Sequence, residues 1–343
     1  MRAEDTLMFA EAAEAGEMVA AQLMANRALM SELGDRLRRR TPVAALIAGR
    51  GSSDNAGVYA RYLIETRTGV LTSSAALSIS SVYDAHPRLE GAICIAISQS
   101  GQSPDLVASV AAARAGGAFV IAMVNAEGSP LARIADATVP LRAGPERSVA
   151  ATKSFIASLA AVAQLVAVWR RDDALLAALD ALPRQLDDAF RMDWSPALET
   201  LAEARDLYVV GRGVGYGVAR EAALKLKETC GLHAEAFSAA EVRHGPMALV
   251  KTGFPVLLLS QSDETRADAE VLASDFAARG AKVMMSGATA DRRVLALPAL
   301  AAHPAIEPLL LIQSFYRLAA QLAVRRGYDP DHPPFLNKVT ETV

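Results

Sequence analysis

Two short motifs of this chain occur twice, separated by the same number of residues. Gly-Arg-Gly stands at residues 49–51 and again at 211–213, and Ser-Gln-Ser stands at 98–100 and again at 260–262, so each returns after 162 positions (211 − 49 and 260 − 98). Every copy follows an apolar run, which is the pattern of a loop after a buried strand. A repeat this long in a chain of 343 residues predicts two copies of one fold.

The order of apolar runs and helical segments predicts an α/β fold. In the first copy we expect strands near residues 43–48, 70–72, 93–97, 119–124 and 138–141, and in the second near 207–210, 254–260, 282–286 and 294–297. The predicted division is a helical segment over 1–40, a first domain over 41–171, a helical connector over 172–196, a second domain over 197–327 and a tail over 328–343. Parallel α/β sheets bind ligands at the carboxyl ends of their strands, where the repeated motifs stand.

The first 40 residues are predicted to form an amphipathic helix or helix pair. Its largely apolar side is expected to carry Met8, Glu11, Ala15, Met18, Ala21 and Met24. No similar segment precedes the second copy, so this helix could pack across a partner instead of inside either domain.

Composition excludes several classes of function. The 35 basic and 38 acidic residues give a formal charge of −3, which supplies no footprint for nucleic acid or an anionic membrane. Cys94 and Cys230 form no disulfide framework, and neither they nor the five histidines show the spacing of a metal site. The acidic amino terminus is unlike a signal peptide, and no run reaches transmembrane length without charge or turn residues. We therefore expect a soluble, cytoplasmic protein without a metal.

The first Ser-Gln-Ser motif has the features of a phosphate-binding loop. It continues through Gly101 to Ser103-Pro104-Asp105, where serine can cap a helix, proline suits its first position and the helix dipole favours an anion. The second copy instead continues into Asp263 and Glu264, which would repel a phosphate. This asymmetry predicts one phosphate site per chain, in the first domain, although a plain strand-to-helix turn is the alternative.

A helical segment after the second Gly-Arg-Gly motif carries candidate acid–base groups. Glu221, Lys225 and Glu228 are spaced by four and three residues and share one helix face. A surface ion-pair ladder is the ordinary explanation of such spacing. At the ligand-binding edge of a sheet, however, Glu228 could move a proton between adjacent sugar carbons, with Lys225 beside it. His244, in a loop ended by glycine and proline, titrates near neutrality and could open a sugar ring.

Taken in order, these and further motifs resemble the sugar isomerase (SIS) domain family, and within it the isomerase half of glutamine–fructose-6-phosphate aminotransferase and the stand-alone deaminases. The resemblance covers nearly the whole chain. Its motifs are Gly51-Ser52-Ser53, Ser98-Gln99-Ser100-Gly101, Val149 to Lys153, Ala223 to Glu228, His233 to Ala236, Arg243 to Pro246, and the closing segment 334–343 with Lys338.

The resemblance implies a tandem of flavodoxin-like units, each with a five-stranded parallel sheet, and a homodimer whose His244 loop is shared across the interface. It implies that the phosphate of an amino sugar is bound by Ser53, Ser98, Gln99, Ser100 and Ser103, supported by Gly51, Ser52 and Gly101. Val149 and Ala151 would contact sugar hydroxyls. Glu228 would move the proton between C1 and C2, assisted by Lys225 and Glu221, His244 would open the ring, and Lys338 would form an imine with the ketose.

Two departures from the aminotransferase pattern shape the expected reaction. Ala151 replaces a serine, and Arg2 stands where the aminotransferase carries the cysteine nucleophile of its glutaminase domain. We therefore expect glucosamine 6-phosphate and water to give fructose 6-phosphate and ammonia, without a metal or redox cofactor. Within enzymes the alternatives are a fructosamine-6-phosphate deglycase, a galactosamine-6-phosphate deaminase and a glutamine-independent aminotransferase. A non-catalytic sugar-phosphate sensor would not need Glu228, Lys225 and His244 together.

Overall fold

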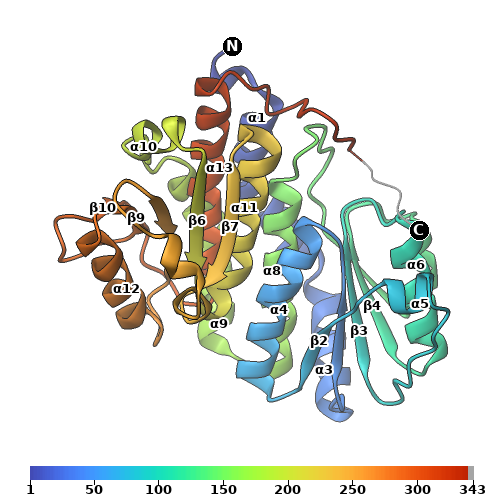
Figure 1. Cartoon of the computed structure of the whole chain (residues 1–343). Helices are drawn as coiled ribbons and strands as arrows, with labels where there is room; N and C mark the ends of the chain where they lie inside the picture. The colour runs from blue at the N-terminus through green and yellow to red at the C-terminus, as the bar shows by residue number, and fades with distance from the viewer. Residues whose placement is uncertain (339–343) are drawn as a thin grey trace. The chain divides into compact units, whose positions relative to one another are not determined.

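The structure is a computed structural model that describes residues 1–338, and it contains two compact units. The amino-terminal unit consists of Glu17–Glu146, Lys153–Asp180 and, at the end of the described chain, Asn337 and Lys338. The carboxy-terminal unit consists of Met1–Gly16, Arg147–Thr152 and Ala181–Leu336. Each unit has its own five-stranded parallel sheet, which confirms the predicted tandem α/β fold (Figure 1). Residues 339–343 of the predicted closing motif lie outside the described residues.

The sheet of the amino-terminal unit has the strand order β2-β1-β3-β4-β5, and all neighbours are parallel. Its strands are β1 (Ala45–Ala48), β2 (Thr72–Ser74), β3 (Ile93–Ser98), β4 (Phe119–Val124) and β5 (Ala137–Pro140). Each lies within two residues of its predicted bounds. The central strand β3 is buried along its whole length and ends at Ser98. The loop that follows it therefore lies at the carboxyl edge of the sheet.

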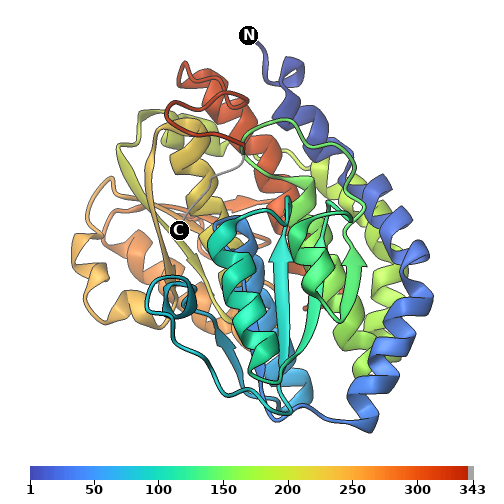
Figure 2. The same ribbon diagram turned by 90° about the vertical axis from the view of Figure 1, so that its right-hand side faces the viewer.

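Helices cover both faces of this sheet (Figure 2). On one face α5 (Ser78–Ser81), α6 (Pro104–Ala115) and α7 (Pro130–Ile134) enclose an apolar core that includes Leu106 and Val120. On the other face α4 (Ser52–Thr68) packs against α8 (Lys153–Arg170), and α3 (Arg27–Arg39) packs against α8 as well. The sheet is thus the middle layer of an α/β/α sandwich.

Helix α8 is apolar along most of its length. Among the described residues it is the one helix that is long and apolar enough to cross a membrane by length and composition, and it carries Lys153 and Arg170 at its two ends. However, 89% of the helix is buried inside the structure. Burial on nearly every side accounts for its apolar composition, because a helix surrounded by protein has no polar face to present.

The first 40 residues form three consecutive long helices, α1 (Leu7–Ala13), α2 (Ala15–Ala25) and α3. The predicted apolar side is correct at its start, where Met8, Glu11 and Ala15 are buried, and wrong at its end, where Ala21 and Met24 are exposed. The buried face runs instead through Gln22, whose side-chain amide donates to the carbonyl oxygen of Ala157 at 2.8 Å. A buried amide gives no hydrophobic signal, so the period of apolar residues misplaced this face.

The sheet of the carboxy-terminal unit has the order β7-β6-β8-β9-β10. Its strands are β6 (Asp206–Gly211), β7 (His233–Ser238), β8 (Pro255–Leu258), β9 (Lys282–Ser286) and β10 (Leu295–Leu297), all parallel to their neighbours. Counted from its own first strand, this is the same order as in the amino-terminal unit. The two units are therefore two copies of one topology, as the repeated motifs predict.

Strand β7 was not among the strands predicted from the sequence. It lies at the edge of its sheet and pairs with β6. His233 and Glu235 on it are exposed, while Ala234 between them is buried. A short strand with one polar face lacks the continuous apolar run by which the other strands were found.

Helices of the carboxy-terminal unit again lie on both faces of its sheet. They are α10 (Ala197–Glu203), α11 (Tyr216–Cys230), α12 (Arg266–Ala278) and α13 (Glu307–Arg325), and the predicted connector region contains α9 (Asp173–Phe190). On one face α12 contributes Leu272 and Phe276 to a core with β8 and β9. On the other face α11 lies next to β6 and packs against α13.

Candidate active site

The acid–base candidates Glu221, Lys225 and Glu228 lie on α11, which starts after β6 at the carboxyl edge of the sheet and runs back to the amino edge, where the parallel strand β7 begins at His233. Glu228 is in the last turn of α11 and so lies near the amino ends of the strands, which corrects the expectation that it stands at the carboxyl edge. A short 3-10 turn over Gly213–Gly215 precedes the helix, and Gly231 ends it in the left-handed conformation with φ of 56°. Glycine adopts this conformation without a steric penalty, so the helix ends there. Because the three residues are spaced by four and three, they lie on one face of α11.

Burial distinguishes this trio from a surface ion-pair ladder. The side chains of Glu221 and Lys225 are 0% and 1% exposed, whereas that of Glu228 is 22% exposed. The Lys225 Nζ lies 2.5 Å from Glu228 Oε2 and 3.4 Å from Glu221 Oε1, and the hydroxyl of buried Tyr316 on α13 donates to Glu221 at 3.3 Å. Glu228 is therefore the one member of the trio whose side chain reaches the surface. Lys225 pairs with it from the interior, and Glu221 pairs with Lys225.

The pKa of Lys225 is raised above its ordinary value. Burial alone would lower it, because a charged ammonium loses its hydration, but attraction to Glu221 and then to Glu228 outweighs that effect. Lys225 is therefore a fixed positive charge at neutral pH.

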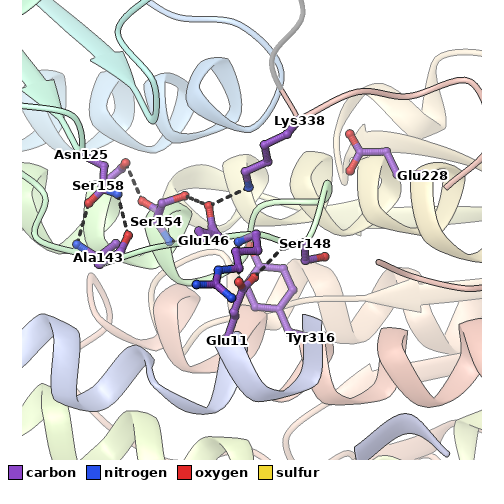
Figure 3. A network of polar contacts seen from close by, with 12 residues as sticks. Glu11, Asn125, Ala143, Glu146, Ser148, Ser154, Ser158, Glu228, Tyr316 and Lys338 are labelled. Atoms are coloured by element: carbon purple, nitrogen blue, oxygen red, sulfur yellow. Dashed lines mark hydrogen bonds and ion pairs between the residues drawn. The ribbon is translucent and has the colours of Figure 1, made fainter. Parts of the chain in front are cut away.

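The predicted sugar-contacting residues Val149 and Ala151 lie in a short segment, Arg147–Thr152, that clusters with the carboxy-terminal unit. The buried carboxylate of Glu11 on α1 fixes the start of this segment, because it accepts from the backbone N–H groups of Arg147 at 2.5 Å and Ser148 at 3.2 Å (Figure 3). Sequence reasoning placed Glu11 on a helix face but gave it no such role.

Asp331 fixes the same segment from the other end of the chain. Its backbone carbonyl accepts from Val149 N–H at 3.4 Å, and its carboxylate accepts from the N–H groups of Leu7 and Met8, both at 2.7 Å. Asp331 therefore ties the start of α1 and the segment around Val149 together. The sequence predicted no role for it in its polar tail.

His244 follows a 3-10 turn over Glu241–Arg243 and is exposed. Within residues 1–338 no hydrogen bond joins its ring to the α11 trio, and its backbone N–H donates to Glu241 O at 2.9 Å. The base of the loop is held by Arg243, which pairs with Asp268 at 2.6 Å. The expectation that this loop serves a second copy of the chain stays a prediction.

The predicted phosphate loop of the amino-terminal unit is an ordered turn between β3 and α6. Ser98 Oγ accepts from Gly101 N–H at 2.9 Å, and Ser100 Oγ accepts from Gln102 N–H at 3.3 Å. Gly101 has φ of 62°, and a Cβ there would lie 2.2 Å from the Ser129 hydroxyl, so only glycine fits. Gln99, Ser100 and Ser103 are all partly exposed. Ser103 stands at the N-cap position of α6, which has proline at its first position, but its side chain makes no capping hydrogen bond.

The structure brings the Gly51-Ser52-Ser53 loop next to the phosphate loop. Gly51 has φ of 53° and precedes α4, whose first turn contains Ser52 and Ser53. The neighbouring Arg50 pairs with Asp105 in the first turn of α6, with Nη2 2.6 Å from Oδ2. Asp105 is fully buried and Arg50 is half exposed, so the guanidinium neutralises a carboxylate that would otherwise repel an anion there. Sequence reasoning missed this Arg50–Asp105 pair.

The equivalent loop of the carboxy-terminal unit, residues 260–265, is occupied by carboxylates of the protein itself. Glu307 accepts from Ser262 N–H at 2.5 Å and from Ser262 Oγ at 2.7 Å. Asp263 accepts from the N–H of Thr265 at 2.9 Å and from the side-chain amide of Gln261 at 2.7 Å. The donors that would bind an anion in this loop are therefore already used.

Lys338, at the end of the described chain, pairs with Glu146 within the amino-terminal unit. The two side chains approach to 3.3 Å between Nζ and Oε2 (Figure 3). Glu146 is fully buried and also accepts from Ser154 at the start of α8. The sequence gave no signal for Glu146, because it lies 192 residues before its partner.

Comparison with known proteins shows the family. A model of the SIS domain matches residues 44–168 and 200–297, which together make up more than half of the chain. The chain belongs to the SIS domain family. The two SIS matches fall on the two copies of the sheet topology described above.

Curated SIS relatives include glutamine–fructose-6-phosphate aminotransferases (isomerizing). That of Aeropyrum pernix is 37% identical over 85% of this chain and 50% of the relative, and that of Thermotoga maritima is 33% identical over 84% of this chain and 50% of the relative. The chain thus spans about half the length of these curated relatives.

Solved SIS structures match over nearly the full chain. A protein from Silicibacter pomeroyi DSS-3, described as a phosphosugar isomerase, is 41% identical with a TM-score of 0.91 and covers 95% of this chain and 100% of its own. The C-terminal domain of glucosamine-fructose-6-phosphate aminotransferase from Francisella tularensis is 27% identical with a TM-score of 0.85, over 96% of this chain and 98% of its own.

Proposed function

We propose that this protein is an amino-sugar phosphate deaminase of the SIS family, which converts glucosamine 6-phosphate and water to fructose 6-phosphate and ammonia. The observation that carries the proposal is the α11 trio, in which a partly exposed Glu228 is paired with a buried Lys225. A partly exposed carboxylate that is held by a buried cation is suited to proton transfer between adjacent carbons.

In the proposed reaction His244 opens the sugar ring. Glu228 removes the proton from C2 of the open aldose, and the electron pair of that C–H bond forms the C1–C2 double bond of an enolamine. The electron pair of the C1 carbonyl moves to O1, which takes a proton from water. Lys225 lies beside the charge that develops in this step and offsets it. Glu228 then returns the proton to C1, which leaves an imine at C2, and water adds to C2 and releases ammonia.

Phosphate binding is assigned to the amino-terminal unit. The partly exposed hydroxyls and amides of the Ser98–Ser103 loop, together with Ser53, supply donors, and the Arg50–Asp105 pair removes the nearby negative charge. In the carboxy-terminal unit Glu307 and Asp263 already use the equivalent donors. These contacts support one phosphate site per chain.

The named relatives favour a second candidate, amino transfer to fructose 6-phosphate, which is the same proton transfer in reverse. Glutamine as the nitrogen source would require a nucleophile that hydrolyses it. The chain has two cysteines, and both are buried. Loss of hydration raises the pKa of Cys94 to about 12 and that of Cys230 to about 11, so neither is a reactive thiolate at neutral pH. Deamination needs only water as its second reactant, and a panel of substrates distinguishes it from amino transfer.

Ammonia release from a panel of substrates tests the proposal. The panel contains glucosamine 6-phosphate, galactosamine 6-phosphate and fructosamine 6-phosphate, and we expect ammonia and fructose 6-phosphate from the first. Release from only one of the other two would assign the protein to the matching deaminase or deglycase. Fructose 6-phosphate incubated with ammonium or with glutamine tests the aminotransferase. Binding of a sugar phosphate with no turnover in any arm would instead indicate a sensor.

A further inference from the structure

The tail lysine Lys338 and the buried carboxylate of Glu146 form an ion pair within the amino-terminal unit. We propose that Glu146 is the positioning residue of Lys338, which holds its ammonium group and takes its proton when the amine attacks the carbonyl carbon of an open-chain ketose phosphate. The inference rests on the proposed function in taking a ketose phosphate as the ligand.

The geometry fixes one oxygen of Glu146 toward the lysine. Its Oε1 accepts from the backbone N–H of Ser154 at 3.1 Å, and its Oε2 accepts from the Ser154 hydroxyl at 2.7 Å and faces the Lys338 Nζ at 3.3 Å (Figure 3). Ser154 belongs to the first turn of α8, so a rigid, buried helix sets the orientation of the carboxylate. Helix α8 therefore fixes the position of the Glu146 oxygen that faces the Lys338 amine.

Burial indicates that the Glu146 carboxylate is present to pair with a cation as well as to accept hydrogen bonds. The Glu146 side chain is 0% exposed and that of Lys338 is 26% exposed, so the pair joins a buried anion to a cation that still reaches solvent. An ionised carboxylate is costly to bury unless a cation faces it. The contacts to Ser154 alone could be made by a neutral glutamine. The negative charge is what the ammonium group requires.

The proton balance of imine formation gives this charge a use. The ammonium passes one proton to Glu146 Oε2, and the freed lone pair of Nζ forms a bond to C2 of the ketose while the carbonyl electron pair moves to oxygen. Glu146 returns its proton to that oxygen. The resulting hydroxyl leaves as water after taking a second proton from Nζ by way of Glu146. The lone pair of Nζ forms the C=N bond as water leaves, and the iminium nitrogen keeps the last of the three ammonium protons. Glu146 thus ends as a carboxylate beside a cationic iminium, as it began beside an ammonium.

Reductive trapping tests the inference on the full chain. The protein is incubated with cyanoborohydride and either fructose 6-phosphate or tagatose 6-phosphate, and the adduct is located by peptide mass spectrometry. We expect an adduct on Lys338 in the wild type and in S154A, which keeps the carboxylate. In E146Q the rate of trapping should fall by roughly 100-fold, and E146D should recover part of it. Thermal unfolding of E146Q should stay near that of the wild type, because glutamine can keep the contacts to Ser154.

Three results would overturn the inference: trapping in E146Q at the wild-type rate, a wild-type adduct on another lysine, or no adduct with either ketose. If E146Q does not fold, the trapping rates of S154A and E146D decide. The inference predicts faster trapping in S154A than in E146D, and equal rates in the two variants would count against Glu146. Ammonia release measured on the same proteins tests the proposed function separately. An adduct without ammonia release rejects the deaminase and keeps this inference, whereas ammonia release without an adduct does the reverse.

Discussion

At the scale of single residues, Lys225 shows how burial changes the meaning of a sequence pattern. The spacing of Glu221, Lys225 and Glu228 is common on exposed helices, where each ion pair contributes little to stability. Here Lys225 and Glu221 are almost fully buried, so neither charge can exchange its partner for water. Removing one partner therefore leaves an uncompensated charge in the interior.

We predict that Lys225→Met lowers the free energy of unfolding by roughly 3–5 kcal/mol, because it leaves Glu221 buried without its cation. Since the pKa of Lys225 is raised in the folded state above its ordinary 10.5, its stabilising contribution is complete below about pH 10.5 and is lost as the pH rises through the higher folded value. Chemical denaturation from pH 7 to pH 11 should show this loss in the wild type and not in the variant.

The matched control is Lys251→Met, because Lys251 is exposed. It should change the free energy of unfolding by less than about 0.5 kcal/mol. Equal effects of the two substitutions would show that Lys225 is no more important to the fold than a surface lysine.

Which residues could be predicted depends on how far apart their partners lie in the sequence. The trio on α11 could be predicted, because residues three and four apart meet on any helix. The pairs Arg50–Asp105 and Glu146–Lys338 could not, since their members are 55 and 192 residues apart and only the folded chain brings them together. Glu11 was correctly placed on the buried side of the first helix. Its contacts to backbone N–H groups could not be predicted, because a carboxylate buried against such groups leaves no pattern in the sequence.

At the scale of elements, the two strand-to-helix loops of the repeat have diverged in what they bind. Both begin with Ser-Gln-Ser at the end of a buried strand. In the loop after β3 the Ser100 hydroxyl accepts a hydrogen bond from Gln102 N–H within its own turn, whereas after β8 the Ser262 hydroxyl donates to Glu307. In the second loop the Ser262 donors are thus taken by the carboxylate of Glu307, whereas the first loop keeps partly exposed donors.

Matched substitutions in the two loops test this difference. Ser100→Ala should raise the KM for the sugar phosphate by roughly tenfold or more, as expected when a hydrogen bond to a charged group is lost. Ser262→Ala should leave KM unchanged and lower the free energy of unfolding by roughly 1–3 kcal/mol, because buried Glu307 loses a donor. Steady-state kinetics and denaturation of both variants make the comparison, and an equal rise in KM for both would contradict a single phosphate site.

The elements that were predicted well are those with a strong apolar signal. The nine predicted strands all occur within two residues of their expected bounds, because parallel strands buried on both faces read as continuous apolar runs. The edge strand β7 was missed because one of its faces is polar, and the buried face of α2 was misplaced because Gln22 lies on it. Local patterns fail where a polar side chain is buried or a strand is half solvated.

At the scale of the whole molecule, one topology occurs twice and the two copies carry different chemistry. The carboxy-terminal unit holds the buried acid–base trio and the segment with Val149 and Ala151, and the amino-terminal unit holds the hydroxyl loop, Ser53 and Lys338. Duplication thus supplied two units of the same topology. In our proposal the amino-terminal unit contributes the phosphate-binding residues and the carboxy-terminal unit contributes the proton-transfer residues.

The central claim is that Glu228 moves a proton between C1 and C2 of the sugar, and hydrogen exchange measures this step without relying on ammonia. Fructose 6-phosphate is incubated with the protein in deuterium oxide, and the signals of the C1 protons are followed by NMR. The account predicts that the wild type, and the control Glu235→Gln on the exposed edge strand, replace a C1 proton with deuterium. Glu228→Gln should slow this exchange by roughly 1,000-fold. Exchange in Glu228→Gln at the wild-type rate would contradict the account.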